Sequence, residues 1–297
     1  MTEQMPGLAP DAQIYERGYR SYEGDRTGVT GAVKTLVRHS VRAVLGLGRS
    51  ARHKVMPLAV IGFAFVPAVV FVGVAALLPR DIEGEFLPSY AEYYGFISAA
   101  LFLFAAFVAP ELLCSDRRTG MLGVYLASPL DRQSYLLGKT IAILSILAIV
   151  TIGPPLLLLI ALSLEEAGPA TWGEGISLGL RIIAAGAMMS SIFAAISMAV
   201  SATTDRKGAA TATTLGLLVG TSAVTNALIE GGNQSPLFHL ADLLTLPFEL
   251  AFRIHGEQGD WTSSEVSTSL MWLAAVAIVV ICAAWIWDRY RRMLVRR

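Results

Sequence analysis

Residues 140–163 read TIAILSILAIVTIGPPLLLLIALS and contain no charged side chain. A helix rises about 1.5 Å per residue, so a run of this length reaches across the roughly 30 Å of hydrocarbon in a bilayer. The Gly-Pro-Pro triplet near its middle removes two backbone donors, which predicts a kink or break at mid-depth. The run therefore predicts a transmembrane helix that bends at Pro154 and Pro155.

Five further apolar runs have the length of a membrane span. They cover residues 55–79, 93–113, 182–202, 208–229 and 270–287. The chain is 54% hydrophobic and 15% charged, whereas soluble proteins carry about 25% charged residues. One buried helix of a soluble protein accounts for one such run but not for six. We expect an all-α polytopic membrane protein with six transmembrane helices.

The Lys and Arg residues are segregated by this six-span arrangement. Of the 23 basic residues, 20 fall in segments on one side of the membrane, and the other three are Arg80, Arg181 and Arg253. Basic residues favour the cytoplasmic side of a membrane. Both termini are therefore predicted to be cytoplasmic, with the chain in the inner (plasma) membrane.

A helical pattern precedes the first span. Val33 and Leu36 fall on one face of a helix, while Lys34 and Arg38 fall on the opposite face. This pattern predicts an amphipathic helix that lies in the inner membrane interface. A charged flank that only orients the first span is the alternative. The expected order is a partly disordered cytoplasmic tail at 1–30, the interfacial helix at 31–54, the transmembrane domain at 55–287 and a basic cytoplasmic C-terminus at 288–297.

The segment between the second and third spans is the most distinctive part of the chain. Residues 111–139 read ELLCSDRRTGMLGVYLASPLDRQSYLLGK. A charged turn leads into a short helix, which ends at Ser128-Pro129 because proline cannot continue it. One face of that helix is apolar, and a plain connection between two spans needs no such face. We infer that the face meets a socket on a partner protein; packing against its own bundle or the bilayer surface is the alternative.

This segment resembles the corresponding loop in permease subunits of the type-2 ABC transporter family. The shared pattern is an acidic residue, a charged turn, a short coupling helix, a Ser-Pro-Leu break and a Leu-Leu-Gly-Lys start to the third span. Here the pattern reads Glu111, Arg117-Arg118, Gly120 to Leu126, Ser128-Pro129-Leu130, Arg132 and Leu136-Leu137-Gly138-Lys139. The six-span layout, the interfacial helix and the long outer segment before the sixth span are similar as well.

The resemblance implies that the loop at 114–139 contacts a separate ATP-binding subunit, which carries ATP and Mg. It also implies a second permease, either another copy of this chain or a similar one. Coupling to the ATPase is thereby assigned to Arg118, Gly120, Met121, Leu122, Tyr125 and Leu126. Anchoring of the loop is assigned to Glu111, Arg117, Ser128, Pro129 and Lys139.

Glu111 sits at the inner edge of the second span, where a carboxylate is costly unless it is paired or hydrated. Arg117 and Arg118 follow within reach of it. An ion pair with one of them would stiffen the loop. A carboxylate that extends to the membrane surface is the alternative.

The fifth span is rich in glycine and threonine. Gly216 and Gly220 form a small-xxx-small pattern that permits close helix approach, and Thr221 and Asn226 can bond to a neighbouring helix. With the Pro154-Pro155 break, these residues are candidates for the translocation pathway or the dimer interface. Ordinary helix packing is the alternative for both sets.

The outer segment at 230–269 is too long for a plain hairpin. Its apolar part at 237–254 contains Asp242, Pro247 and Glu249, so it is too short and too charged to span the membrane. We expect a re-entrant or interfacial pair of helices broken at Pro247.

Several kinds of chemistry are missing from the sequence. There is no phosphate-binding G-x-x-x-x-G-K-[ST] motif, and the four histidines lack metal-ligand spacing. No predicted span carries a charged residue at mid-depth, which disfavours ion-coupled transport. The chain is therefore expected to bind no cofactor or metal and to catalyse no reaction.

The resemblance implies the transmembrane subunit of an ATP-driven exporter, and the uncharged spans suit a hydrophobic or amphipathic substrate. The alternatives are an ion-coupled secondary transporter and a membrane-embedded enzyme.

Overall fold

The computed structural model describes residues 24, 27–48, 50–77, 86–232, 235–259, 261 and 266–293. The regular elements in these residues are all helices. Six of the described helices are long and apolar enough to cross a membrane, each overlapping one predicted span. The predicted all-α polytopic membrane fold is confirmed. Most of the predicted N-terminal tail lies outside the described residues.

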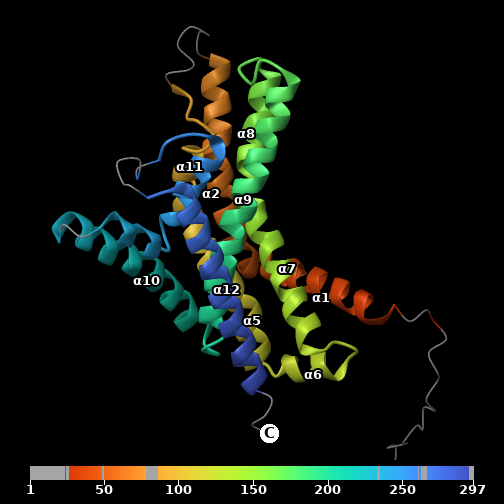
Figure 1. The fold of residues 1–297 in the computed structure, drawn as a ribbon. Coiled ribbons are helices and arrows are strands. Elements are labelled where there is room, and N and C mark those ends of the chain that lie inside the picture. Colours follow the sequence, from red (N-terminus) through yellow and green to blue (C-terminus); the bar gives the residue numbers. More distant parts are fainter. Residues whose placement is uncertain are drawn as a thin grey trace, which may run out of the picture.

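Figure 1 shows the order of the helices along the chain. The spanning helices are α2 (Ala51–Leu77), α5 (Ser98–Arg118), α7 (Arg132–Thr151) continued by α8 (Gly153–Leu164), α9 (Trp172–Ser201), α10 (Lys207–Asn226) continued by η1 (Ala227–Gly231), and α12 (Thr268–Met293). The shorter helices are α1 (Gly28–Val44), α4 (Tyr93–Phe96), α6 (Met121–Ala127), η2 (Pro236–Ala241) and α11 (Leu246–His255).

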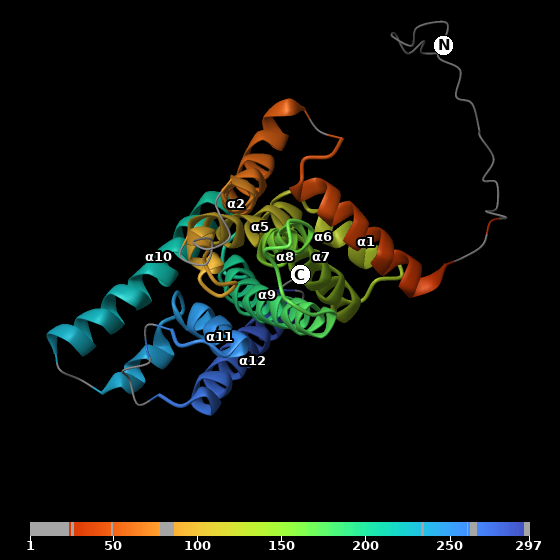
Figure 2. The same ribbon diagram turned by 90° about the horizontal axis from the view of Figure 1, so that it is seen from above.

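Helix α9 forms the centre of the bundle. Of the residues in its apolar 18-residue stretch 72% are buried, whereas only 17% are buried in the corresponding stretches of α10 and α12. Helices α5, α7, α10, α11 and α12 all pack on α9. Seen from above, α10 extends away from this central group (Figure 2). The bundle therefore has a packed interior around α9 and leaves most of α10 open.

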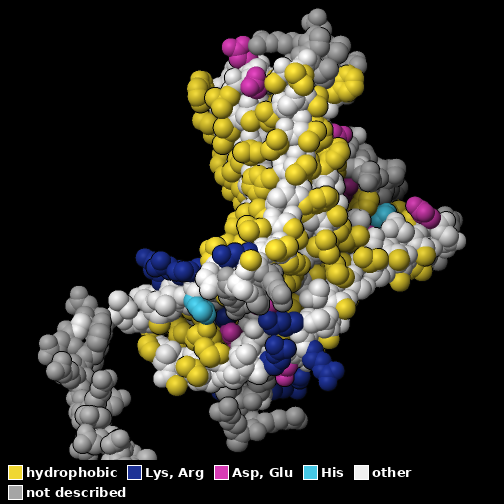
Figure 3. All heavy atoms as spheres, turned by 180° about the vertical axis from the view of Figure 1, so that it is seen from behind, with side chains coloured by type: hydrophobic (Ala, Val, Ile, Leu, Met, Phe, Trp, Pro, Cys, Tyr) yellow, Lys and Arg dark blue, Asp and Glu magenta, His cyan; other side chains and the backbone are white. Residues whose placement is uncertain are grey.

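The side chains on the surface follow the charge segregation of the sequence. In Figure 3 an apolar band covers the upper and middle part of the bundle, and Lys and Arg side chains gather around the lower end and α1. Helix α6 and the C-terminal end of α12 lie at that same end (Figure 1). This is the arrangement expected if that end faces the cytoplasm.

Helix α9 begins ten residues before the predicted fourth span. Its start is capped by Thr171, whose Oγ1 accepts a hydrogen bond from the Glu174 amide at 3.3 Å. Glu174 Oε2 accepts a hydrogen bond from the Ala170 amide at 3.1 Å. This reciprocal arrangement resembles a capping box and satisfies free helix-terminal donors. The first turns of α9 are too polar to be detected by hydropathy.

The third span breaks where the Gly-Pro-Pro triplet predicted. Helix α7 ends at Thr151 and α8 begins at Gly153, with both prolines buried in the first turn of α8. Thr151 Oγ1 lies 3.1 Å from the Gly186 carbonyl oxygen and 2.8 Å from Ser190 Oγ, both on α9. The break is therefore packed tightly against the central helix.

The outer segment forms the expected pair of short helices, η2 and α11, but the break lies before Pro247. Proline fits the first turn of a helix because its missing donor has no intrahelical acceptor there, and Pro247 occupies that place in α11. Asp242 makes the turn instead. Its Oδ1 accepts hydrogen bonds from the Leu244 and Thr245 amides at 3.0 and 3.1 Å. The prediction of a break at Pro247 was wrong for this reason.

The crossing of α7 and α9 gives a stability prediction. A Cβ added at Gly186 would lie 3.0 Å from the Thr151 carbonyl oxygen and against the Ile152 side chain. Gly186→Ala should therefore destabilise the fold by about 1–3 kcal/mol, as overpacking does, and lower the thermal midpoint in detergent by several degrees. Gly62→Ala is the matched control because its Cβ would meet nothing within 4 Å. Equal midpoints for the two variants would contradict the tight crossing.

Candidate functional site

The loop between α5 and α7 is built around helix α6. Gly120 precedes α6 with φ +74°, a left-handed conformation that glycine adopts without strain. Ser128 and Pro129 end the helix, and Asp131 caps the start of α7 by accepting a hydrogen bond from the Ser134 amide at 2.8 Å. Hydrogen bonding to Ser134 lowers the pKa of Asp131, so the cap stays ionised at neutral pH. The turn residues thus fix α6 across the end of the bundle.

The apolar residues of α6 divide between two faces. Leu122 and Tyr125 are half-buried and pack against the core of the bundle. Met121 and Val124 are exposed, at 38% and 62% of their surface. Leu126 is half-buried, while Arg118 and Gly120 are exposed. The packing alternative therefore accounts for Leu122 and Tyr125, and the exposed apolar surface belongs to Met121 and Val124.

Val124 was missed by the sequence analysis. The apolar residues of a seven-residue helix do not reveal which side meets the bundle, so the sequence predicted a single apolar face. The packing of Leu122 and Tyr125 on the bundle turns Val124 toward the solvent.

A buried ion pair lies at the base of this loop. Lys139 on α7 is 1% exposed, and its Nζ lies 2.7 Å from Asp116 Oδ2 on α5. The same Nζ lies 3.1 Å from Ser40 Oγ on α1. The Tyr135 hydroxyl donates a hydrogen bond to Asp116 Oδ2 at 2.9 Å. Lys139 therefore joins α1 to both helices that flank the loop.

Three tyrosines extend this network to α6 and α12. The ring of Tyr135 lies 5.9 Å from that of Tyr125 and 6.1 Å from that of Tyr290, measured between centroids. Lys139 Nζ lies 5.5 Å from the centroid of the Tyr125 ring, within the range of a cation–π interaction. We call these residues the Lys139 cluster: Ser40, Asp116, Tyr125, Tyr135, Lys139 and Tyr290. Because Tyr125 lies on α6, a displacement of α6 would change the contacts within this cluster.

Arg117 joins the end of α5 to the turn between α9 and α10. Its guanidinium donates hydrogen bonds to the carbonyl oxygens of Ser201, Ala202 and Thr204. Its Nε also lies 3.1 Å from Asp205 Oδ1. Several carbonyls around one guanidinium hold the turn against α5, because each would otherwise need another donor.

Glu111 pairs with a residue that the sequence analysis did not consider. The sequence predicted Arg117 or Arg118 as its partner, and the structure brings Lys207 Nζ within 2.7 Å of Glu111 Oε2. Lys207 begins α10, nearly a hundred residues further along the chain. The loop is therefore connected to α10 as well as to α1, α7 and α12.

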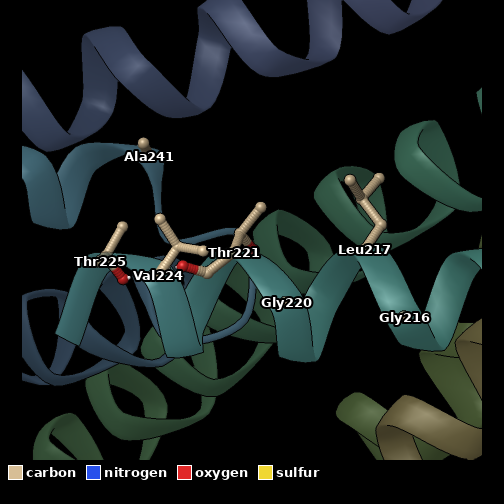
Figure 4. A pocket seen from close by; sticks show the side chains of 7 residues that line it. All are labelled: Gly216, Leu217, Gly220, Thr221, Val224, Thr225 and Ala241. Carbon is tan, nitrogen blue, oxygen red and sulfur yellow. Dashed lines mark hydrogen bonds between the residues drawn. The ribbon is translucent and has the colours of Figure 1, made fainter. Parts of the chain in front are cut away.

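The small residues of α10 border a shallow groove (Figure 4). Its volume is about 380 Å³, and it is lined by Gly216, Leu217, Gly220, Thr221, Val224, Thr225 and Ala241. A Cβ at Gly216 or Gly220 would meet nothing within 4 Å. Thr221 and Asn226 donate to carbonyls of α10 itself. The glycines therefore pack against no other helix of the described chain, and the buried Pro154 and Pro155 lie apart from this groove.

Within the described part of the chain, no group of three or more His, Cys, Asp and Glu side chains is placed to hold a metal ion.

The buried ion pair gives a second prediction. Lys139→Met should leave Asp116 buried without its cation, which costs several kcal/mol in other proteins, and should lower the thermal midpoint. Combining Lys139→Met with Asp116→Asn should recover part of that loss, because no charge then remains buried. Arg292→Met removes an exposed ion pair with Asp288 and should change the midpoint little. A double variant no better than Lys139→Met would contradict the coupling of the two residues.

Comparison with known families gives an independent assignment. A family model described as "ABC-2 family transporter protein" matches residues 59–286, from within α2 to within α12. A comparison with curated proteins gives no match. The match covers most of the chain, with four spans matched in full and the first and sixth in part, in agreement with the resemblance carried by residues 111–139. The chain is therefore a multi-pass membrane protein that belongs to the ABC-2 transporter family.

Proposed function

We propose that this chain is the transmembrane subunit of an ATP-driven exporter and that α6 couples it to a separate ATP-binding subunit. Membership of the family makes the chain an ABC transporter permease, a membrane-transport component that is not itself catalytic. ATP and Mg would be held by the partner subunit. Family membership also disfavours the ion-coupled transporter and the membrane-embedded enzyme.

The observation that carries the proposal is that α6 exposes apolar side chains on one side, here called its tip, and is packed against the bundle on the other. Met121 and Val124 offer apolar surface to a partner, and such helices bind by inserting apolar residues into a groove. Leu122, Tyr125 and the Lys139 cluster hold the other side of α6 to the bundle. A force applied to the tip is therefore passed to the spanning helices instead of being absorbed by a flexible loop.

The same contacts suggest how movement spreads. Nucleotide binding draws the ATP-binding subunits together, and α6 moves with the subunit that holds it. Through Lys139 and Asp116 this displaces α1, α5 and α7, and through Arg117 and Glu111 it displaces the start of α10. Rigid displacement of packed helices is a common route to a change of access.

A second permease would complete the assembly. The open face around Gly216 and Gly220 is suited to close contact with another helix. We place a second copy of this chain, or a similar permease, against this face. The apolar bundle favours a hydrophobic or amphipathic substrate that is moved outward.

The proposed orientation predicts which positions are accessible from each side. Ala127→Cys at the exposed end of α6 should react with a membrane-impermeant maleimide only in inverted vesicles. Gly173→Cys, at the exposed start of α9, should react only in intact cells. The native Cys114 is buried and Cys282 is half-buried in α12, so the unmodified chain gives the background. The opposite labelling pattern would contradict the predicted topology, because α6 would then lie outside the cell.

The coupling assignment predicts that Val124→Asp uncouples the subunits. An acidic side chain at the exposed tip should abolish co-purification of the ATP-binding subunit and substrate transport, with an unchanged thermal midpoint because Val124 is 62% exposed.

Phe238→Asp is the matched control for Val124→Asp. It makes the same kind of change at an apolar residue that is 42% exposed on η2, in the outer segment, and it should leave subunit association intact. Retention of both association and transport by Val124→Asp would refute the assignment of α6.

A further inference from the structure

A second cavity opens at the opposite end of the bundle from α6. It has a volume of about 840 Å³ and lies between α5, the end of α10 with η1, η2 and α11. Pockets that hold small organic molecules have volumes of about 300–1,000 Å³. We call it the outer cavity. Its size is sufficient for a ligand with several rings.

The walls of the outer cavity are aromatic. Phe102 on α5 and Phe248 on α11 lie edge to face, with ring centroids 5.5 Å apart. Phe252 and Trp261 line the cavity as well, and His239 stacks on Trp261 at 4.5 Å between centroids. Aromatic faces attract cations and pack well against flat apolar groups.

The charged side chains that line the outer cavity are carboxylates. They are Glu92, Glu230 and Glu249, and no Lys or Arg is among the described lining residues. Glu249 is neutralised by Arg253, whose Nε lies 3.2 Å from Glu249 Oε1. Neither Glu92 nor Glu230 has an ion-pair partner in the described part of the chain. The cavity therefore keeps two negative charges that an occupant of positive charge would balance.

The neutral polar groups of the cavity do not reverse its charge. Burial lowers the pKa of His239, against the influence of nearby Asp242, Glu249 and Glu230, so this imidazole is neutral at pH 7. Thr245 Oγ1 and His239 Nδ1 are buried without a hydrogen-bond partner among the described residues. Both atoms are shielded from solvent, so neither adds charge or an accessible hydrogen-bonding group to the cavity.

We propose that the outer cavity binds an amphipathic organic cation, with aromatic rings packing on its apolar part and Glu92 and Glu230 facing its charge. This deepens the proposed function by naming the chemical class of the cargo, and it rests on that function only for the statement that the ligand is transported. A bare metal ion fits poorly, because the described residues supply no converging set of ligands. An organic anion would meet carboxylates.

The test uses the purified chain alone in lipid nanodiscs, without nucleotide or ATP-binding subunit. Tetraphenylphosphonium is the probe, and tetraphenylborate is its matched control because it has the same shape and the opposite charge. Binding is measured relative to empty nanodiscs, because the two ions partition unequally into lipid. Saturable binding of the phosphonium above that background, with at least tenfold weaker saturable binding of the borate, is expected by equilibrium dialysis. Equal binding of both ions, or no saturable binding of the phosphonium, would overturn the proposal.

Variants locate the site. Combining Glu92→Gln with Glu230→Gln should weaken phosphonium binding by about tenfold or more, since it removes both unbalanced charges. Phe252→Leu should weaken it by about two- to fivefold, the size of one cation–π contact. Glu165→Gln changes an exposed carboxylate outside the cavity and should have no effect. Equal losses in the Glu165 variant and the double variant would show a general surface attraction and refute the site.

The cation site and the coupling role of α6 can be refuted independently of each other. Phosphonium binding needs no partner subunit, so it is measured whether or not α6 couples to an ATPase. Conversely, loss of transport in Val124→Asp should leave phosphonium binding unchanged.

Discussion

The ion pair between Lys139 and Asp116 is the interaction on which the rest of the structure depends. A lysine that is 1% exposed at the end of a spanning helix is stable only if its charge is balanced and its donors are used. Asp116 supplies the balance, while Ser40 and the Tyr125 ring supply further contacts. These three contacts come from α5, α1 and α6, so with α7 the cluster joins four helices. Their relative positions are therefore fixed together, because a shift of any one would leave a buried charge poorly paired.

Because of this constraint, a movement of the exposed helix α6 would be transmitted to the spanning helices. A short amphipathic helix on a mobile loop would follow a partner without moving the bundle. Here Leu122 and Tyr125 attach α6 to the bundle, and Arg117 and Glu111 attach the same end to the α9–α10 turn. Met121 and Val124 are the large apolar side chains of this helix that remain exposed. The outer cavity lies at the other end of α5 and α10, so helices that contact the loop also border the cavity.

Features of the fold that have local causes could be predicted from the sequence, whereas contacts between distant residues could not. The six spans follow from run length and hydropathy, and the break between α7 and α8 follows from two adjacent prolines; all of these are local. The pairing of Glu111 with Lys207 joins residues far apart in sequence, so no local pattern could predict it. The same holds for the exposure of Val124, which depends on where α6 meets the bundle. The start of α9 and the place of Pro247 were misjudged because capping and first-turn geometry outweighed hydropathy there.

The most direct test of the account places a photo-crosslinking amino acid at position 124 of the chain in its native membrane. The account predicts a covalent adduct between this position and an ATP-binding subunit, and no such adduct when the same amino acid stands at position 238. Adducts formed from position 124 only with lipid or with the chain itself would contradict it, because α6 would then contact no motor subunit.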